Sequence, residues 1–218
     1  MCCSTTWSYT PSESRSSMSR AVFLDRDGVI NEMVPSLQGP DSPRSVDEFK
    51  LVPGAAAAIH RMNNLGLPVV VVSNQPGVAK GKFPAANLEA MTALMKDVLK
   101  GDHAVVQGIY YCMHHPQSVI DDYRKSCDCR KPKPGLLLQA AKEMNLRLVG
   151  SYMVGDQPRD MIAGKSVGCT TFLVGAQSLQ AKPSEADYVC GDLESAARLI
   201  AQLESLNFKT IGNVASYQ

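Results

Sequence analysis

The chain of 218 residues lacks any strong imbalance of charge. Its 22 basic residues nearly balance its 21 acidic ones, which gives a formal net charge of +1. It has neither the basic stripe that is typical of nucleic-acid binding nor an acidic tail. We therefore expect no nucleic-acid partner and no attraction to a membrane surface.

The chain also lacks a long apolar run. No stretch approaches the ~18 consecutive apolar residues of a membrane span. Residues 1–19 contain no apolar core of the kind that a secretory signal needs. These residues are rich in Ser and Thr without hydrophobic periodicity, so we expect a disordered tail.

The seven cysteines are an odd number for a framework of disulfide bonds. Three of them, Cys112, Cys127 and Cys129, lie in one segment that also contains histidines. This pattern favours a metal site in a reducing compartment over a secreted disulfide scaffold. We therefore expect a cytoplasmic protein.

Short apolar runs alternate with helical patterns along most of the chain. The near-continuous valines of Leu67–Val72 suit a parallel strand that is covered on both faces. The alternation predicts an α/β fold, a Rossmann-like three-layer sandwich with a central parallel sheet, in one domain over residues 20–208 before a C-terminal tail, 209–218. The expected strands are 21–24, 67–72, 108–111, 149–154, 170–174 and 187–190. The expected helices are 54–64, 84–100, 134–144, 157–166 and 192 to about 206.

Polar residues stand at the ends of three expected strands. Asp25 ends the first, Ser73 the second and Asp156 the fourth. Because the carboxyl ends of parallel strands gather at one sheet edge, we expect these side chains to converge. Lys131, which follows the cysteine segment, could reach the same edge. Ser73 or Asp156 alone could be a helix cap, but together the four residues are of the kinds that phosphoryl transfer uses.

Phosphoryl transfer gives each of these residues a role. Asp25 would be the nucleophile and form an aspartyl-phosphate. Asp27 would protonate the leaving oxygen and later activate water. Ser73 and Lys131 would bind the phosphoryl oxygens.

The same edge predicts a Mg²⁺ site. This cation prefers oxygen ligands, and Asp25, Asp27 and Asp156 would hold it together with a backbone carbonyl. Asp160, four residues after Asp156, would orient Lys131 or a water on the metal.

A second cluster predicts a zinc site. Four soft ligands lie within 18 residues, in the spacing Cys-x-His-x₁₂-Cys-x-Cys: Cys112, His114, Cys127 and Cys129. Three thiolates and an imidazole suit a closed, tetrahedral Zn²⁺ site, which would staple the polar stretch 117–126. His115 could replace His114. The alternatives to zinc are free buried cysteines or a disulfide between two of them.

These motifs resemble those of the haloacid dehalogenase superfamily of phosphatases, in its histidinol-phosphatase-like branch. The resemblance extends over residues 21–206. The four superfamily motifs correspond to Asp25-Arg26-Asp27-Gly28, Ser73-Asn74-Gln75, Lys131 and Gly155-Asp156 with Asp160.

Within that branch, segments 110–117, 127–132 and 151–156 are most similar to heptose-bisphosphate phosphatases. The resemblance implies a Mg²⁺-dependent enzyme that removes the 7-phosphate of D-glycero-D-manno-heptose 1,7-bisphosphate. It also implies that the zinc-stapled loop replaces a large cap domain. Histidinol phosphate or another small phosphomonoester is the alternative substrate. The residues implied to contact substrate are Ser73, Asn74, Gln75, Pro76, Arg130 and Lys131.

Two positions depart from the family's pattern. Met33–Ser36 stand where the family has an Asp-His-Gly-Tyr-like segment, in a longer loop, and Gln157 replaces a lysine that contacts substrate. Both changes predict altered specificity with unchanged chemistry. A non-catalytic phospho-acceptor or zinc-dependent interaction module is the alternative of another class, but it would need neither Asp27 nor a zinc loop. We expect a monomeric enzyme.

Overall fold

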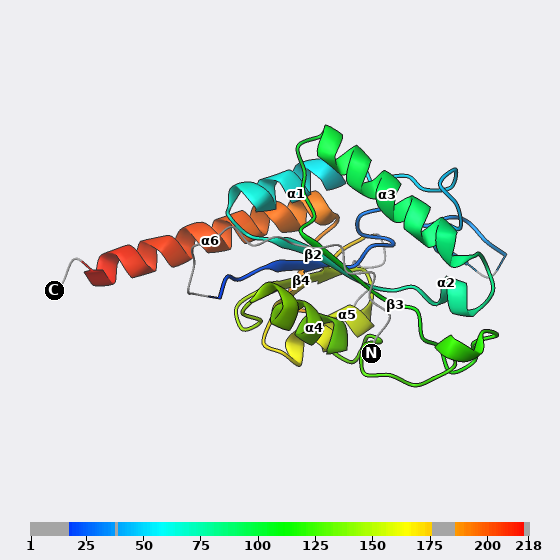
Figure 1. Ribbon diagram of the computed structural model, residues 1–218. Coiled ribbons are helices and arrows are strands. Elements are labelled where there is room, and N and C mark those ends of the chain that lie inside the picture. Colours follow the sequence, from blue (N-terminus) through cyan, green and yellow to red (C-terminus); the bar gives the residue numbers. More distant parts are fainter. Residues whose placement is uncertain (1–17, 38, 176–185, 216–218) are drawn as a thin grey trace.

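A computed structural model of the chain describes residues 18–37, 39–175 and 186–215, with side chains through Leu206 (Figure 1). Nearly all of the expected tail, 1–19, lies outside these residues. Ser19 is described, and it pairs with Leu146 in an isolated parallel bridge. Ser19 is therefore part of the folded unit.

Six strands form one sheet, and every pairing between them is parallel. The strands are β1 (Val22–Leu24), β2 (Val69–Asn74), β3 (Gly108–Cys112), β4 (Tyr152–Gly155), β5 (Thr170–Leu173) and β6 (Tyr188–Val189). Their order across the sheet is β3-β2-β1-β4-β5-β6. This architecture confirms the predicted α/β fold with a central parallel sheet.

Helices cover both faces of this sheet (Figure 1). They are α1 (Ala55–Asn64), α2 (Pro76–Ala79), α3 (Ala85–Gly101), α4 (Gly135–Met144), α5 (Pro158–Lys165) and α6 (Leu193–Ala215), with a 3₁₀ turn at Asp121–Tyr123. The helices α1, α3 and α6 lie on one face, and α4 and α5 on the other (Figure 1). The three layers are those that the alternating pattern predicts.

The strands form these layers because successive side chains point to opposite faces. In β1, Val22 and Leu24 pack with α1, α3 and α6, whereas Phe23 packs with α4 and α5. In β2, Val71 and Val72 divide in the same way. Both faces are buried, which explains the lack of polar alternation in these strands.

The structure differs from the sequence prediction in three elements. β4 begins at Tyr152 rather than at residue 149, because Gly150 adopts a positive φ of 79° in the turn before it. The short helix α2 was not predicted. The last helix extends to Ala215, so the predicted end near residue 206 is wrong. Asp192 caps its start, because the Ser195 N–H donates to Asp192 Oδ1 at 2.7 Å.

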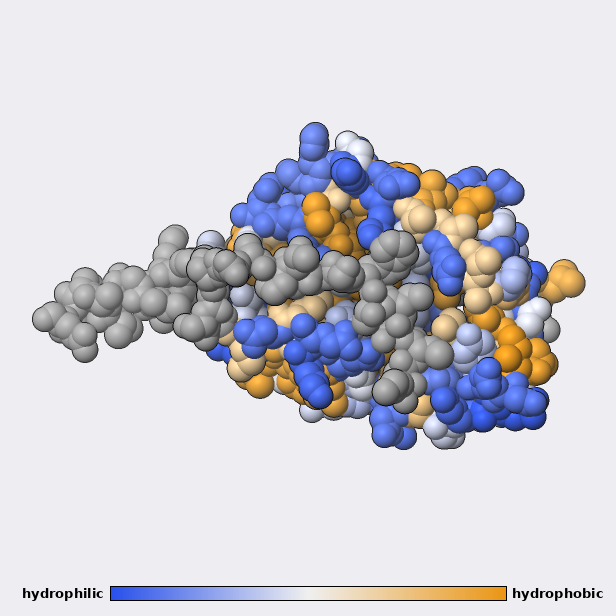
Figure 2. All heavy atoms as spheres, viewed as in Figure 1, coloured by the Kyte–Doolittle hydropathy of each residue, from blue (hydrophilic) through white to orange (hydrophobic). Residues whose placement is uncertain are grey.

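Hydrophilic side chains cover much of the visible face of the molecule, with smaller hydrophobic areas between them (Figure 2). Within the described residues, no helix has both the length and the apolar character needed to cross a bilayer. This agrees with the lack of a long apolar run in the sequence.

Candidate active site

The carboxyl ends of the central strands bring the predicted polar residues to one edge of the sheet. In the register, Leu24 lies beside Val71 of β2 and Val154 of β4. Asp25 therefore emerges between the ends of two neighbouring strands, next to Ser73 and Asp156. Asp25 and Ser73 are almost fully buried, at 3% and 1% exposure.

Lys131 is the cation at this edge. Its Nζ lies 3.1 Å from Asp25 Oδ2 and 2.6 Å from Asp160 Oδ1, and it donates to the Val72 carbonyl at 2.8 Å. Burial opposes the charge, but Asp160 and Asp25 outweigh it and raise the pKa of Lys131. The contact with Asp160 is compatible with the first of the two roles expected for it, which stay predictions.

Asp156 lies near Asp25, and none of the ion pairs among the described residues involves its carboxylate. Its Oδ1 is buried and has no hydrogen-bond partner among the described residues, and its Oδ2 accepts from Gln157 Nε2 at 3.0 Å. Burial and the charge of Asp25 raise the pKa of Asp156 to about 6. Gly28, with φ of +80°, lets the chain turn here, since a Cβ at this position would lie 2.6 Å from Asp156 Oδ2.

Asp27 is held away from these carboxylates by two donors. Its Oδ1 accepts from Arg26 Nε at 2.9 Å, and its Oδ2 accepts from Gln75 Nε2 at 2.8 Å. Burial would raise the pKa of Asp27, but the charge of Arg26 and hydrogen bonds from Ser42 and Gln75 outweigh it and lower this pKa. The oxygens that converge as a possible metal site belong to Asp25, Asp156 and Asp160, all within 4.8 Å of one another. The role of Asp27 as a metal ligand stays a prediction.

The segment after β2 uses its side chains to hold other parts of the site. The Asn74 side chain exchanges two 3.0 Å hydrogen bonds with the backbone N–H and carbonyl of Lys131. Gln75, 1% exposed, donates to Ser73 Oγ at 3.1 Å as well as to Asp27. Pro76 begins α2. The predicted substrate contacts of these residues stay predictions.

The thiol cluster comes together from the end of β3 and from the loop that follows it. Its members are Cys112, His114, Cys127 and Cys129, with ligand atoms all within 4.8 Å of one another. The three Sγ atoms are 3.1–3.5 Å apart, and His114 Nδ1 lies 3.3 Å from Cys129 Sγ. These separations exceed the ~2.05 Å of a disulfide bond. The expected alternative ligand, His115, instead accepts from the Gln117 N–H at 3.1 Å.

The loop of the thiol cluster is held by one contact within itself and by two hydrogen bonds to α2. Arg130 is half-buried, and its Nη1 donates to the His114 carbonyl at 3.4 Å. The Ser118 hydroxyl and the Val119 N–H both donate to the Ala79 carbonyl at the end of α2, each at 2.9 Å. The loop is therefore held against the end of α2, the short helix that follows β2.

A cavity of about 390 Å³ opens beside Asp156. Its lining includes both positions where the sequence departs from the family's pattern. Among the lining residues are Gly28, Met33, Pro40, Asp156, Gln157 and Val174.

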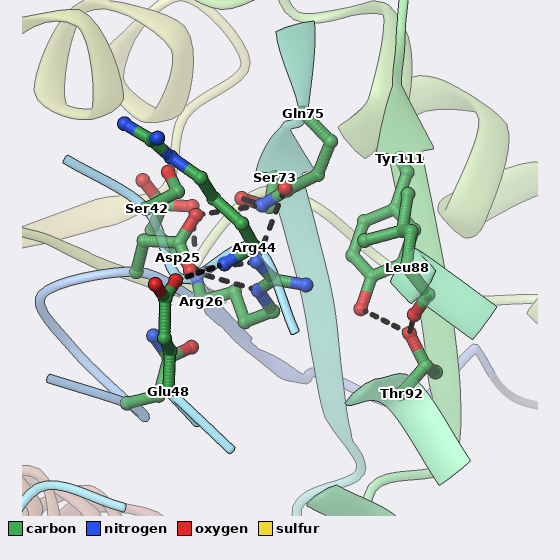
Figure 3. Close-up of polar contacts among 12 residues, drawn as sticks. Asp25, Arg26, Ser42, Arg44, Glu48, Ser73, Gln75, Leu88, Thr92 and Tyr111 are labelled. Carbon is green, nitrogen blue, oxygen red and sulfur yellow. Dashed lines mark hydrogen bonds and ion pairs between the residues drawn. The ribbon is translucent and has the colours of Figure 1, made fainter. Parts of the chain in front are cut away.

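Sequence reasoning missed the importance of Arg26. This side chain is fully buried at the centre of the polar contacts in Figure 3. Its Nη2 donates to Gln75 Oε1 at 3.1 Å, and its guanidinium pairs with Asp27 at 2.8 Å. An arginine between two carboxylates at the end of an apolar strand is the signal that could have found it.

Comparison with known proteins points to one family. The HAD-hydrolase-like family model matches residues 128–196. The D-glycero-beta-D-manno-heptose-1,7-bisphosphate 7-phosphatase of Escherichia coli is 40% identical over 151 residues, which cover 69% of this chain and 76% of the relative. The protein of the same name from Pasteurella multocida is 37% identical over 191 residues, which cover 86% of this chain and 100% of the relative.

A solved structure gives the same answer. The D,D-heptose 1,7-bisphosphate phosphatase from B. bronchiseptica, complexed with magnesium and phosphate, matches with a TM-score of 0.71 at 34% identity. The match covers 84% of this chain and 98% of that one. The resemblance seen in the sequence motifs is thus confirmed, and a non-catalytic module is excluded. The chain belongs to the HAD-like phosphoric monoester hydrolases, in the family of the heptose-1,7-bisphosphate 7-phosphatases.

Proposed function

We propose that this enzyme is a Mg²⁺-dependent phosphatase that removes the 7-phosphate of D-glycero-β-D-manno-heptose 1,7-bisphosphate. The observation that carries the proposal is the buried Asp25, which lies between the ammonium of Lys131 and the carboxylate of Asp156. The named activity of relatives at 37–40% identity supports the substrate.

The reaction takes two steps. In the first, an Asp25 carboxylate oxygen attacks phosphorus, the bond from phosphorus to the sugar oxygen breaks, and Asp27 gives its proton to that oxygen. In the second, water attacks the aspartyl-phosphate and gives a proton to Asp27, while the bond from phosphorus to Asp25 breaks and phosphate leaves. Lys131 and the Ser73 hydroxyl bind the phosphoryl oxygens in both steps.

The residues present fit a divalent cation. Asp156 Oδ1 is buried without a partner among the described residues, and burial together with the nearby charge of Asp25 disfavours the ionised form of Asp156. A cation shared by Asp25 and Asp156, with Asp27 as the further predicted ligand, would offset this repulsion. When bound, it supplies positive charge against the phosphoryl oxygens. The magnesium in the B. bronchiseptica structure supports the choice of metal.

The thiol cluster fits a structural zinc ion. A tetrahedral site with Zn–S bonds of about 2.3 Å has sulfur atoms roughly 3.8 Å apart, and the three Sγ atoms lie at 3.1–3.5 Å. Cys112, Cys127, Cys129 and His114 Nδ1 would complete such a site and leave no position for substrate. The zinc would then order the loop that carries Arg130, the predicted substrate contact.

We also propose that the enzyme acts as a monomer in the cytoplasm, with a small phosphorylated substrate and no nucleic-acid or membrane partner. The nearly balanced charge supports the absence of a nucleic-acid or membrane-surface partner. Light scattering of the purified chain tests the oligomeric state; a dimer mass would contradict it.

Phosphate release from a substrate panel tests the function. The panel holds the heptose 1,7-bisphosphate, other sugar phosphates and histidinol phosphate, each with Mg²⁺ and with EDTA. We expect the highest kcat/KM for the heptose bisphosphate and loss of turnover with EDTA. A clear preference for histidinol phosphate would overturn the substrate, and full activity in EDTA would overturn the metal.

A further inference from the structure

We propose that Arg26 and Gln75 are positioning residues that together hold the Asp27 carboxylate in the orientation for proton transfer. This inference rests on the proposed function, since it takes Asp27 as the proton partner of Asp25. It gives Gln75 a role inside the protein, distinct from the substrate contact implied by the family resemblance.

We call Arg26 and Gln75 the clamp, because each of them holds one oxygen of the Asp27 carboxylate. Arg26 Nε donates to Oδ1 at 2.9 Å, and Gln75 Nε2 donates to Oδ2 at 2.8 Å. A carboxylate with only one held oxygen can still rotate about its last bond, whereas two donors from different segments fix its plane. Ser42 and Asn31 also hydrogen-bond to Asp27, so the carboxylate is held by further donors as well. The Asp27 side chain is 9% exposed and so is not sealed off.

The orientation of the Gln75 amide is determined by its partners. Its oxygen accepts from Arg26 Nη2 at 3.1 Å, and its nitrogen donates to both Asp27 and Ser73 Oγ. Figure 3 shows Arg26 and Gln75 pointing toward one another at the ends of neighbouring strands. One amide therefore links the proton partner to the hydroxyl predicted to bind the phosphoryl group.

The clamp is anchored in the core on the far side of the site. The Arg26 guanidinium lies over the Tyr111 ring, 5.6 Å from its centre. The Tyr111 hydroxyl lies 3.1 Å from Thr92 Oγ1, which donates to the Leu88 carbonyl of α3 at 2.7 Å (Figure 3). A fully buried arginine with such neighbours has little rotamer freedom. The order of the clamp is therefore present before substrate binds, as efficient positioning requires.

Comparing two leaving groups gives a measurement that distinguishes this positioning role from a merely structural one. A sugar oxygen leaves poorly as an anion and needs the proton of Asp27, whereas p-nitrophenolate leaves readily without one. A loosened Asp27 should therefore slow phosphoryl transfer from a sugar phosphate but spare it from p-nitrophenyl phosphate. Water attack in the second step also needs Asp27, so the aryl substrate should show a burst of nitrophenolate before slow turnover.

The experiment compares Gln75→Met, Asp27→Asn and the double variant. The probes are p-nitrophenyl phosphate and the sugar phosphate that ranks first in the panel. For Gln75→Met we expect kcat for the sugar phosphate to fall about 10- to 100-fold with little change in KM, a part of the roughly 10²–10⁴ that general acid–base catalysis contributes. The nitrophenolate burst should keep its full amplitude, which also counts folded sites. The double variant should be no slower than Asp27→Asn, because Gln75 acts through Asp27.

Two further variants control this comparison. Gln75→Glu keeps the shape and the acceptor for Arg26 but loses both donors, so it should be at least as slow as Gln75→Met. Gln139→Met makes the same chemical change on α4, where the Gln139 amide donates to Glu143, and should leave both substrates unchanged.

Three outcomes would overturn the proposal that Arg26 and Gln75 position Asp27. They are a rise in KM with unchanged kcat in Gln75→Met, a burst that disappears in that variant, and losses that multiply in the double variant. If Asp27→Asn loses sugar-phosphate turnover while Gln75→Met keeps it, only the clamp is wrong. If Asp27→Asn itself keeps full turnover, the proton-transfer step of the proposed function is wrong, and the clamp falls with it.

Discussion

The carboxylate cluster and the thiol cluster are both arranged like metal sites, yet the chain holds them in different ways. Asp25 and Asp156 emerge from neighbouring buried strands, and Lys131 already forms ion pairs with Asp25 and Asp160. The thiols sit at the end of β3 and on a loop that has only a 3₁₀ turn of its own. The fold therefore holds the carboxylates in place by itself, whereas we expect the order of the thiol loop to depend on the proposed zinc ion.

Because of this difference, the proposed chemistry and the proposed substrate recognition lie in two separate regions of the molecule. The groups that we propose to react stand at the edge of the packed sheet, where small displacements are costly. Arg130, the predicted substrate contact, stands beside Cys129 on the loop. We therefore expect changes at the sheet edge to act on kcat, and changes in the thiol cluster to act on stability and KM.

Asp25→Asn should give the largest effect. Replacing the nucleophile should lower kcat by a factor on the order of 10⁴ or more. Lys131 keeps Asp160 and the Val72 carbonyl as partners, so the free energy of unfolding should change by no more than about 1 kcal/mol. Steady-state kinetics and thermal melting measure the two quantities. Asp128→Asn, which alters an exposed acid, is the control and should keep full activity; an active Asp25→Asn would refute the nucleophile.

Cys129→Ser should lower stability more than catalysis. The ligands Cys112 and Cys127 enclose a loop of about 15 residues, and losing a cross-link of this span costs roughly 3 kcal/mol. For a chain of this size that lowers Tm by about 6–12 °C. Metal analysis should find one zinc per chain in the parent and none in the variant, with KM raised and kcat largely kept.

Cys169→Ser is the matched control for the thiol cluster. Cys169 is buried, like Cys112 and Cys129 of the cluster, but lies outside it. The Cys169→Ser variant should bind as much zinc as the parent and have the same KM, even if its Tm changes. A folded parent protein with no bound zinc would contradict the four-ligand site.

The sequence predicted the strand ends well because their signal is local. Asp25, Ser73 and Asp156 each follow an apolar run, and the parallel sheet alone brings such ends together. The cysteine spacing predicted the thiol cluster for the same reason. In both cases the sequence pattern was enough to predict which side chains lie close together.

The contacts of Asp27 could not be predicted in this way. Gln75 and Arg26 lie 48 and 1 positions away from it, and only packing decides that both donate to it. Ser42 reaches it from a loop without a regular pattern. The sequence identified the residues at the site but gave no means of choosing between a substrate contact and a contact within the protein.

Mg²⁺ binding should depend on pH at the carboxylate cluster. Burial and Asp25 raise the pKa of Asp156 to about 6, above its usual value near 4. The metal needs the ionised form, which falls from about nine tenths at pH 7 to about one tenth at pH 5, so affinity should weaken about tenfold. Calorimetric titration at the two pH values measures this. Asp156→Asn should bind more weakly at both, without the pH dependence.

The raised pKa of Asp156 weakens metal binding as the pH falls, but toward acid pH it should stabilise the metal-free folded protein. Because the pKa of Asp156 is higher in the folded state, the folded chain binds this proton more tightly than the unfolded chain does. The contribution of Asp156 to stability should therefore grow as the pH falls from about 6 toward 4. A Tm that changes by the same amount in Asp156→Asn over this range would contradict the assignment.

Gln157→Lys should give the smallest effect, and it tests where the two regions meet. Gln157 stands on the sheet edge, yet it lines the 390 Å³ cavity with Met33 and Pro40. A lysine there adds a positive charge facing that cavity. Since a partly exposed ion pair contributes about 0–1 kcal/mol, KM for a bisphosphate should fall by about threefold, with kcat and the KM of a monophosphate unchanged.

The control for this last change is Gln157→Met, because Gln157 Nε2 also donates to Asp156 Oδ2. If only the methionine variant lowers kcat, the role of Gln157 is to hold the Asp156 carboxylate. The sheet edge then determines the chemistry but not the choice of substrate. If the lysine variant discriminates between substrates while the methionine variant is neutral, the sheet edge contributes to recognition as well. Specificity would then be shared between the thiol loop and the first turn of α5, so the separation between the two regions holds for stability but not for substrate choice.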